Sequence, residues 1–152
     1  NVIAENGVIQ QMSLQNIKTA LSHGLVPLVH GDVAFDTVRG GTITSTETIF
    51  TYLTQHLPVN RILLIGLESG VYDQTGETIP HLTPENLSQY ESALGGSSGV
   101  DVTGGMYTKV VDMLELAKLR DDLSVRVMSG TQDDLLTQTL LGQAEPGTLI
   151  TG

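Results

Sequence analysis

The sequence of 152 residues contains no cysteine, and basic residues are scarce. Without cysteine the chain forms neither disulfides nor thiolate metal sites, a composition typical of cytoplasmic proteins, where we expect it to act. Seven Lys and Arg residues against 17 Asp and Glu residues give a net charge of −10. Nucleic acid and anionic membrane surfaces repel such a chain at long range, so neither is an expected partner.

Long hydrophobic runs are absent as well. The longest apolar runs, such as Ile62–Ile65, are too short to cross a bilayer. The length predicts a single domain spanning residues 1–152. The chain starts at Asn1 rather than Met and runs almost at once into sequence with the pattern of a folded domain, so we expect a fragment of a longer protein.

Short β-branched or apolar runs alternate with amphipathic stretches along the chain. This alternation predicts an α/β fold whose strands form a largely parallel sheet. The runs with the composition of strands buried on both faces are Val26–His30, Arg61–Ile65, Val125–Met128 and Thr148–Ile150.

Helix starts and stops are marked by capping residues. Ser13 is the expected N-cap of a first helix that Gly24 ends, and Thr44 to Glu47 has the pattern of a capping box. A further helix is expected to begin at Thr83-Pro84-Glu85. Another is expected to cover Met106–Leu119, with one apolar face formed by Val110, Met113, Leu114 and Ala117. A last helix is expected to cover Leu135–Leu141 after a cap at Thr131–Asp134.

The segment Asp101–Lys109 has the outline of a phosphate site. Gly104 and Gly105 let a ligand approach the backbone, and the N–H groups that open the following helix attract anions. Lys109, about one turn inside the helix, is placed to fold back over the same anion. The alternative is a glycine-rich loop that only caps the helix, with Lys109 on the solvated face.

Three other loops combine glycine with polar side chains near expected strand ends or helix starts, where open α/β sheets bind ligands. Gly31 and Asp32 follow the first strand, Ser45 and Thr46 precede a helix, and the loop after the second strand contains Gly66, Gly70 and Tyr72. Asp32 is alternatively a turn residue, and Tyr72 a half-buried aromatic residue at a strand end. No spaced cluster of His or carboxylate side chains favours a protein metal site.

The ordered set of these motifs resembles the amino acid kinase superfamily, and within it most closely the isopentenyl phosphate kinases. The motifs that carry the resemblance run through nearly the whole chain: Asn6–Ile9, Gly24–Asp36, Gly70–Asp73, Gly99–Met106 with Lys109, and Ser129-Gly130 through Gly147-Thr148. The resemblance implies a three-layer αβα sandwich, of which this chain is the carboxyl-terminal, nucleotide-binding half. The amino-terminal half of that fold, with its phosphate loop and substrate-binding residues, has no counterpart here.

The resemblance also implies a function and roles for individual residues. The intact protein would use ATP and Mg²⁺ to phosphorylate a small phosphomonoester, while this chain alone would not turn over. Lys109 and Asp32 are the implied catalytic residues. The nucleotide site would comprise Gly66, Gly70, Tyr72, Gly104, Gly105 and Lys109, and the substrate site Gly31, Ser45 and Thr46. A homodimer is a further possibility.

Two departures from the family pattern leave other functions open. The family usually has Ser-Gly-Asp where this chain has Ser45-Thr46-Glu47, and Leu67 stands where an active-site carboxylate is expected. One alternative is therefore a nucleotide- or metabolite-binding module without catalysis. Others are a kinase for a different phosphate or phosphonate, and an acidic domain that serves only oligomer contacts.

Overall fold

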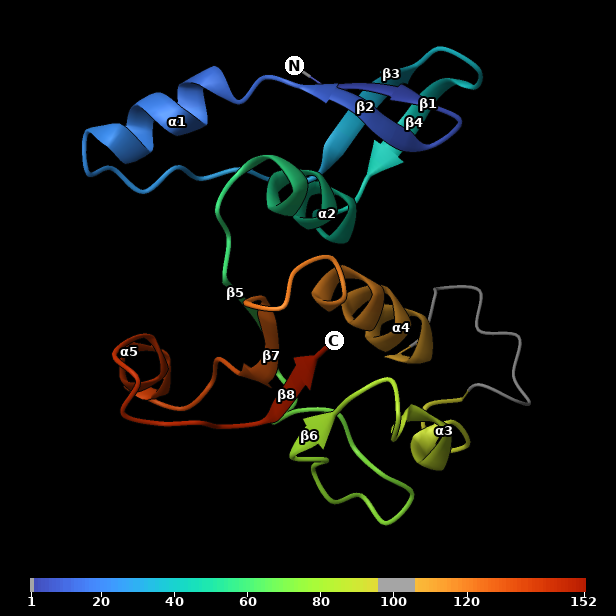
Figure 1. The fold of residues 1–152 in the computed structure, drawn as a ribbon, viewed down its shortest axis with the longest axis vertical. Coiled ribbons are helices and arrows are strands. Elements are labelled where there is room, and N and C mark those ends of the chain that lie inside the picture. Colours follow the sequence, from blue (N-terminus) through green and yellow to red (C-terminus); the bar gives the residue numbers. More distant parts are fainter. Residues whose placement is uncertain (1, 96–105) are drawn as a thin grey trace. The chain divides into compact units, whose positions relative to one another are not determined.

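A computed structural model describes residues 2–95 and 106–152 and contains helices and strands throughout (Figure 1). The chain folds as two compact units, residues 1–58 (unit 1) and residues 59–152 (unit 2). The predicted single domain, which concerns how the units join, stays a prediction. None of the helices in the described ranges has both the length and the apolar character that a bilayer crossing requires.

Unit 1 is built on a four-stranded sheet in the order β2-β1-β3-β4. Strands β1 (Val2–Glu5) and β2 (Val8–Met12) are antiparallel, as are β3 (Asp32–Asp36) and β4 (Gly40–Thr44), whereas β1 and β3 are parallel. Helix α1 (Gln15–Ser22) follows β2, and α2 (Thr46–His56) packs against β2. The core of this unit contains Ala4, Ile9, Ile17, Ala34 and Ile49.

Unit 2 contains a second four-stranded sheet in the order β5-β7-β8-β6. Its strands are β5 (Arg61–Gly66), β6 (His81–Leu82), β7 (Ser124–Ser129) and β8 (Thr148–Thr151). Its helices are α3 (Leu87–Tyr90), α4 (Met106–Ala117) and α5 (Leu135–Leu140). Helix α4 packs on β7 and β8, and the core between them contains Val110, Met113, Leu114, Val125 and Ile150.

Much of the predicted secondary structure is confirmed. Strands β5, β7 and β8 cover the predicted runs, and α4 buries the four residues expected on its apolar face. The α/β class is confirmed too, with mixed sheets: β5 with β7 and β6 with β8 are parallel pairs, but β7 and β8 are antiparallel. In unit 1 tight turns join β1 to β2 and β3 to β4, and such short connections allow only antiparallel pairing.

The predicted strand Val26–His30 is wrong. These residues have no regular secondary structure, and Val26 and Leu28 are 94% and 95% exposed. The strand begins later, at Asp32, so Asp32 opens β3 instead of projecting from the carboxyl end of a strand. A β-branched run forms a strand only when a neighbouring strand pairs with it. The residues from Asp32 onward pair with β1 and β4, and they form β3.

Three predicted helix starts also need correction. The N-cap of α1 is Leu14 and makes no side-chain cap bond, so Ser13 does not cap that helix. Thr83-Pro84-Glu85 forms a turn, and α3 begins only at Leu87. Asp134 precedes α5 in a left-handed conformation (φ 59°) without a capping bond. By contrast Gly24, with φ +70°, ends α1 as predicted, because glycine adopts positive φ without steric cost.

Candidate functional site

The carboxyl ends of β5 and β7 form one edge of the sheet in unit 2. Gly66 lies opposite Ser129 in the parallel register, and the Gly130 N–H donates to the Gly66 carbonyl at 2.9 Å. A Cβ on Gly66 would meet no atom of residues 2–95 and 106–152 within 4 Å, so among these residues the backbone here is open to a ligand. The structure thus places the predicted site residue Gly66 at an accessible strand end, where α/β sheets bind ligands.

Ser129, which was not among the predicted site residues, organises this edge. Its hydroxyl donates to the Leu67 carbonyl at 3.3 Å, exchanges a hydrogen bond with the Thr131 hydroxyl at 2.8 Å, and accepts from the Thr131 N–H at 3.2 Å. The side chain therefore joins the loops after β5 and β7. The Ser-Gly pair that follows the apolar run of β7 is the sequence signal that could have identified it.

Gly70 is buried and serves close packing. A Cβ there would lie 2.7 Å from Thr78 Cγ2 and 2.8 Å from Thr148 Oγ1. The Thr148 hydroxyl occupies the space instead and accepts from the Val71 N–H at 2.9 Å. Gly70 therefore brings the loop after β5 against β8, and its contacts within the protein fully account for the glycine.

Tyr72 is half-buried at the end of the same loop. Its hydroxyl accepts from the Ser69 N–H at 3.0 Å, and its backbone pairs with Thr78 in an isolated antiparallel bridge. These contacts fix the ring beside the loop 66–70. The arrangement agrees with the half-buried aromatic residue weighed above.

Asp73 closes the adjoining turn. Its Oδ1 accepts from the Thr75 hydroxyl at 2.7 Å and from the N–H groups of Thr75 and Glu77 at 2.8 and 3.1 Å. The hydrogen bond from the Thr75 hydroxyl has the largest effect on the Asp73 carboxyl and lowers its pKa. Backbone N–H donors lower the pKa further, and desolvation opposes them in part. The Asp73 carboxylate therefore stabilises the turn formed by residues 73–77.

Lys109 lies in the first turn of α4 and is exposed. No ion pair or hydrogen bond engages its ammonium within residues 2–95 and 106–152. Gly104 and Gly105, the other members of the predicted phosphate site, lie outside the described residues.

Gly31, Asp32, Ser45 and Thr46 meet at the start of α2 in unit 1. A Cβ on Gly31 would lie 2.5 Å from the Thr44 carbonyl oxygen, so only glycine fits against the end of β4. The Asp32 carbonyl accepts from the Thr44 hydroxyl at 2.8 Å. The structure thereby brings together all four unit 1 residues that the sequence predicted.

Two of these side chains have local hydrogen bonds. Ser45 Oγ caps α2 by accepting from the Thr48 N–H at 3.2 Å, so the cap lies one residue after Thr44, where the capping-box pattern had placed it. Asp32 Oδ1 accepts from the Val33 N–H at 2.7 Å, and because Asp32 is the first residue of β3, the structure does not show the turn role weighed for it. The exposed Thr46 is the first residue of α2 and therefore lies at the positive end of the helix dipole.

Asp36 is the most strongly hydrogen-bonded carboxylate in the described residues, and sequence reasoning missed it. Oδ1 accepts from the N–H groups of Asn6, Val38 and Arg39 at 2.8 to 3.0 Å, and Oδ2 from the Gly7 N–H at 2.6 Å. Burial acts to raise the pKa of Asp36, but the four N–H donors outweigh it and lower the pKa from 3.8 to about 2. Its role is to fasten the β1–β2 turn to the β3–β4 turn.

The described residues contain no group of three or more His, Asp or Glu side chains that could hold a metal ion. A Mg²⁺ ion that arrives with a nucleotide is held largely by phosphate oxygens and water, with one or two carboxylates, and needs no such group. The open backbone at Gly66 and the unengaged Lys109 ammonium are the features here that fit a nucleotide.

The sequence is similar to known proteins. A model of the amino acid kinase family matches residues 2–129. Isopentenyl phosphate kinase of Haloferax volcanii is 38% identical over 105 residues, which cover 69% of this chain and 42% of the relative. The enzyme of the same name from Methanocaldococcus jannaschii is 33% identical over 129 residues, which cover 85% of this chain and 47% of the relative.

The fold has solved counterparts. A crystal structure of isopentenyl phosphate kinase superposes with a TM-score of 0.75 and 20% sequence identity, covering 99% of this chain and 55% of that protein. At this identity the likeness shows the fold alone. The chain spans about half the length of the curated relatives it matches.

Proposed function

The chain belongs to the amino acid kinase family, and we propose that it forms the ATP-binding half of a kinase acting on a small phosphomonoester. The proposed reaction transfers the γ-phosphoryl group of ATP to isopentenyl phosphate and gives isopentenyl diphosphate and ADP. The observation that carries this proposal is the identity of 33–38% with two isopentenyl phosphate kinases. A cytoplasmic location is part of the same proposal.

In this proposal the nucleotide binds at the carboxyl edge of the unit 2 sheet. Gly66 presents open backbone there, and Tyr72 lies in the loop that follows, with its hydroxyl bonded to the Ser69 N–H. The Lys109 ammonium would pair with the ATP phosphates, since no other group among the described residues engages it. Gly104 and Gly105 would pass close to the same phosphates, and Gly70 shapes the loop through its packing.

The acceptor phosphate is proposed to bind at the start of α2. Gly31, Ser45 and Thr46 lie around the helix N-terminus, where unpaired N–H groups favour an anion. Asp32 is proposed to act near the reaction centre with its second carboxylate oxygen. Mg²⁺, when bound with ATP, would offset the charge that develops on the transferred phosphoryl group.

We further propose that this chain by itself binds nucleotide but does not turn over. Phosphoryl transfer depends on positioning donor and acceptor together within one set of cationic and N–H groups. The chain matches 42–47% of the length of its curated relatives. The rest of the relatives would supply the opposite side of such a cleft, and kinase activity measured with this chain alone would contradict the proposal.

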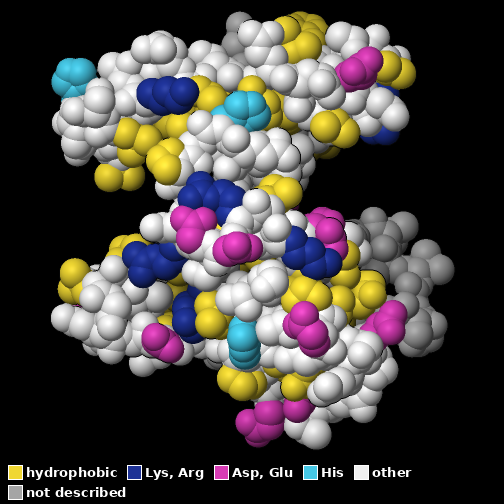
Figure 2. Space-filling model, viewed as in Figure 1, with side chains coloured by type: hydrophobic (Ala, Val, Ile, Leu, Met, Phe, Trp, Pro, Cys, Tyr) yellow, Lys and Arg dark blue, Asp and Glu magenta, His cyan; other side chains and the backbone are white. Residues whose placement is uncertain are grey.

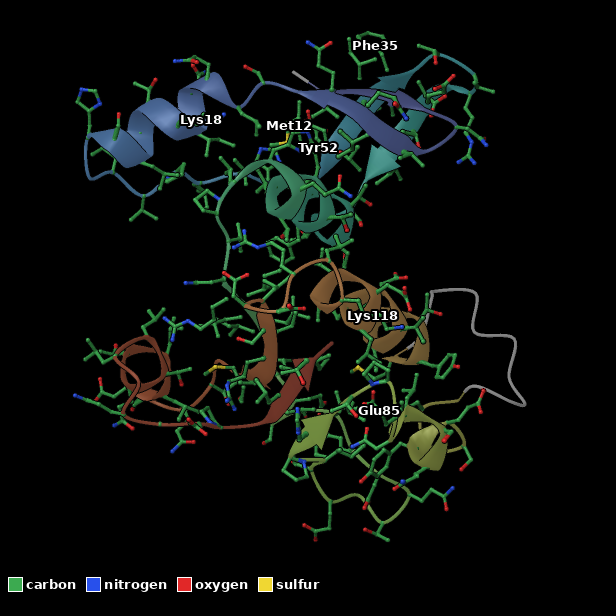
Figure 3. The ribbon with its side chains drawn as sticks, viewed as in Figure 1. Met12, Lys18, Phe35, Tyr52, Glu85 and Lys118 are labelled. Carbon is green, nitrogen blue, oxygen red and sulfur yellow. The ribbon has the colours of Figure 1, made fainter. Side chains whose placement is uncertain are left out.

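Calorimetric titration with Mg-ATP tests the nucleotide site. Lys109→Ala should weaken binding about tenfold or more, since it removes a charge-assisted hydrogen bond worth about 1.5–3 kcal/mol. Lys118→Ala is the matched control, because Lys118 lies just after the same helix and pairs with Glu115 at 2.6 Å (Figure 3). Equal affinity in all three proteins, or no binding to the native chain, would refute the assignment.

A binding module without catalysis is the second candidate function, and Leu67 favours it. This side chain is 82% exposed on the loop after β5, where the family pattern has a carboxylate. Leu67→Asp should leave the fold unchanged, because an exposed side chain makes few contacts that could be lost.

A fusion of this chain to the unmatched part of the Haloferax volcanii relative would separate the two candidates. Activity of the fusion with native Leu67 supports a working kinase. Activity only after Leu67→Asp supports a binding module that does not catalyse phosphoryl transfer. Parallel assays with other small phosphates and phosphonates would detect a kinase of different substrate preference.

A further inference from the structure

A polar hollow lies at the amino-terminal ends of β5 and β7 in unit 2. Asn60, Arg61, Asp122 and Ser124 line it, and its volume is about 410 Å³. Arg61 and Ser124 are the first residues of β5 and β7 and lie opposite each other in the parallel register. All four lining residues belong to unit 2. This space is called the amino-end hollow below.

The amino-end hollow is separate from the edge proposed to bind the nucleotide. Gly66 and Ser129 end β5 and β7, five residues further along than Arg61 and Ser124. Five steps along a strand, at about 3.3 Å each, span roughly 16 Å. The four lining residues include none of those proposed to bind ATP or the acceptor phosphate. A ligand in the hollow would therefore occupy a second site.

Arg61 supplies most of the hydrogen-bond donors of the hollow. Its Nη1 donates to the Thr139 carbonyl and its Nη2 to the Leu140 carbonyl, both at 3.2 Å, and these bonds hold the side chain in place. A guanidinium has five N–H groups, and the other three have no acceptor among residues 2–95 and 106–152. A planar guanidinium held in this way matches the two oxygens of a carboxylate.

Asn60 and Ser124 present two further polar side chains to the hollow. The Ser124 N–H donates to the Asn60 carbonyl at 3.1 Å, so their backbones are fixed relative to each other. Neither the Asn60 side-chain amide nor the Ser124 hydroxyl has a hydrogen-bond partner in the described part of the chain. Both groups are therefore available to a polar ligand.

Asp122 limits the charge that the hollow can accept. Its carboxylate pairs with Arg120, from Nε to Oδ1 at 2.9 Å and from Nη2 to Oδ2 at 2.6 Å. Because this pair is neutral overall, Arg61 leaves one positive charge among the residues around the hollow. Figure 2 shows Lys and Arg side chains beside Asp and Glu side chains elsewhere on the surface of unit 2 as well.

This balance of charge favours a carboxylate over a phosphate. A carboxylate carries one negative charge, whereas a phosphate group carries about −1.5 to −2 at pH 7 and would be repelled by Asp122. Each oxygen of a carboxylate accepts more than one hydrogen bond, so Asp122 can still accept from a ligand while it is paired. All four lining residues are polar, and an apolar ligand would find no matching surface there.

We propose that the amino-end hollow binds a small monocarboxylate with a hydroxyl or ammonium group on the neighbouring carbon. The ligand carboxylate accepts from the remaining N–H groups of Arg61 and from the Asn60 amide. The neighbouring hydroxyl or ammonium group donates to Asp122 and to the Ser124 hydroxyl. The proposal goes beyond the kinase function and uses none of its residues.

Titrations of the chain followed by ¹H–¹⁵N NMR test the site. Glycolate and glycine carry the neighbouring donor, acetate lacks it, and inorganic phosphate is the comparison of higher charge. Glycolate or glycine should shift the amide signals of the four lining residues. The tighter of the two should bind at least about threefold more tightly than acetate, as expected for one added hydrogen bond, and more tightly than phosphate. The comparison of glycolate with glycine identifies the donor as a hydroxyl or an ammonium group.

Two variants locate the ligand. Arg61→Ala should weaken binding of the tighter acid about tenfold or more, because it removes a charge-assisted contact. Since this variant also loses the bonds to α5, Asn60→Ala provides a second test. It should weaken binding about threefold and leave thermal unfolding unchanged, because the Asn60 side chain makes no hydrogen bond within the described residues. Mg-ATP affinity should also be unchanged in Asn60→Ala, which keeps this proposal distinguishable from the proposed function.

Lys118→Ala is the matched control for the loss of a positive charge in unit 2. Lys118 pairs with Glu115 and does not line the hollow, so this variant should bind the acid like the native chain. The proposal would be overturned if neither acid shifted the signals of the lining residues, or if acetate or phosphate bound as tightly as both acids. An affinity unchanged by Asn60→Ala and Arg61→Ala, or reduced equally by Lys118→Ala, would also overturn it, because the acid would then bind elsewhere.

Discussion

Asp36 accepts the backbone N–H of Gly7 at 2.6 Å, across 29 positions of the sequence. The contact joins the turn between β1 and β2 to the strand that ends in Asp36. Gly7 has φ +88°, a conformation that glycine adopts easily. In this conformation its N–H points toward the Asp36 carboxylate. The sheet of unit 1 is thus secured at one end by a single carboxylate with four N–H donors.

Asp36→Asn should lower the thermal stability of the chain. The amide group can accept at one oxygen, but its NH₂ would face an N–H donor of the turn and leave that donor unsatisfied. Thermal unfolding followed by circular dichroism measures the effect. Asp133→Asn, at an exposed position, is the control and should unfold like the native chain.

The contribution of Asp36 should depend on pH. Because folding lowers the pKa of this carboxyl from 3.8 to about 2, its stabilisation is fully present above 3.8 and is lost as the pH falls toward 2. Denaturant unfolding of the native chain and Asp36→Asn should show a constant difference near neutral pH that shrinks through this acid range. A difference that grows on acidification would contradict the assigned shift.

Gly70→Ala should destabilise unit 2 by about 1–3 kcal/mol, because the new methyl group overpacks against Thr78 and Thr148. Gly66→Ala is the matched comparison, since a Cβ there meets no atom of the described part of the chain within 4 Å and stability should hold. Urea unfolding of the two variants measures the contrast. Equal stability losses would show that the loop after β5 does not pack as described.

Ser45→Ala should cost about 1 kcal/mol, the usual loss when a helix N-cap is removed. Ser45→Asp should retain most of the stability, since its carboxylate also accepts the Thr48 N–H. Ser13→Ala is the control for the same chemical change, because Ser13 makes no cap bond to α1. Urea unfolding should therefore distinguish two serines that look alike in the sequence.

Arg61→Ala should destabilise the end of α5. The Arg61 guanidinium donates to the carbonyls of Thr139 and Leu140, both at 3.2 Å, and compensates the negative end of the helix. The expected loss is about 0.5–1 kcal/mol. Arg61→Lys should recover only part of it, since one ammonium does not reproduce the two-pronged contact. Hydrogen exchange of the last α5 amides measures the effect.

The local candidate residues were more predictable than their partners. Gly31 and Ser45 were identified from motifs of a few adjacent residues and from the family resemblance that these motifs carry, and the structure places them together. Asp36 was missed because its donors Asn6 and Gly7 lie about 30 positions away. Ser129 was likewise missed because its bond to the Leu67 carbonyl spans 62 positions.

The sequence by itself determined the α/β class, strands β5, β7 and β8, the buried face of α4 and the end of α1 at Gly24, because hydrophobic period and the turn preference of glycine are local properties. Only the tertiary structure decided that Val26–His30 remains outside the sheets, that β7 and β8 run antiparallel, and that Phe35 stands exposed beside Gly41. Each of these depends on which segment pairs with or covers another, and backbone pairing and burial are decided by residues distant in the chain.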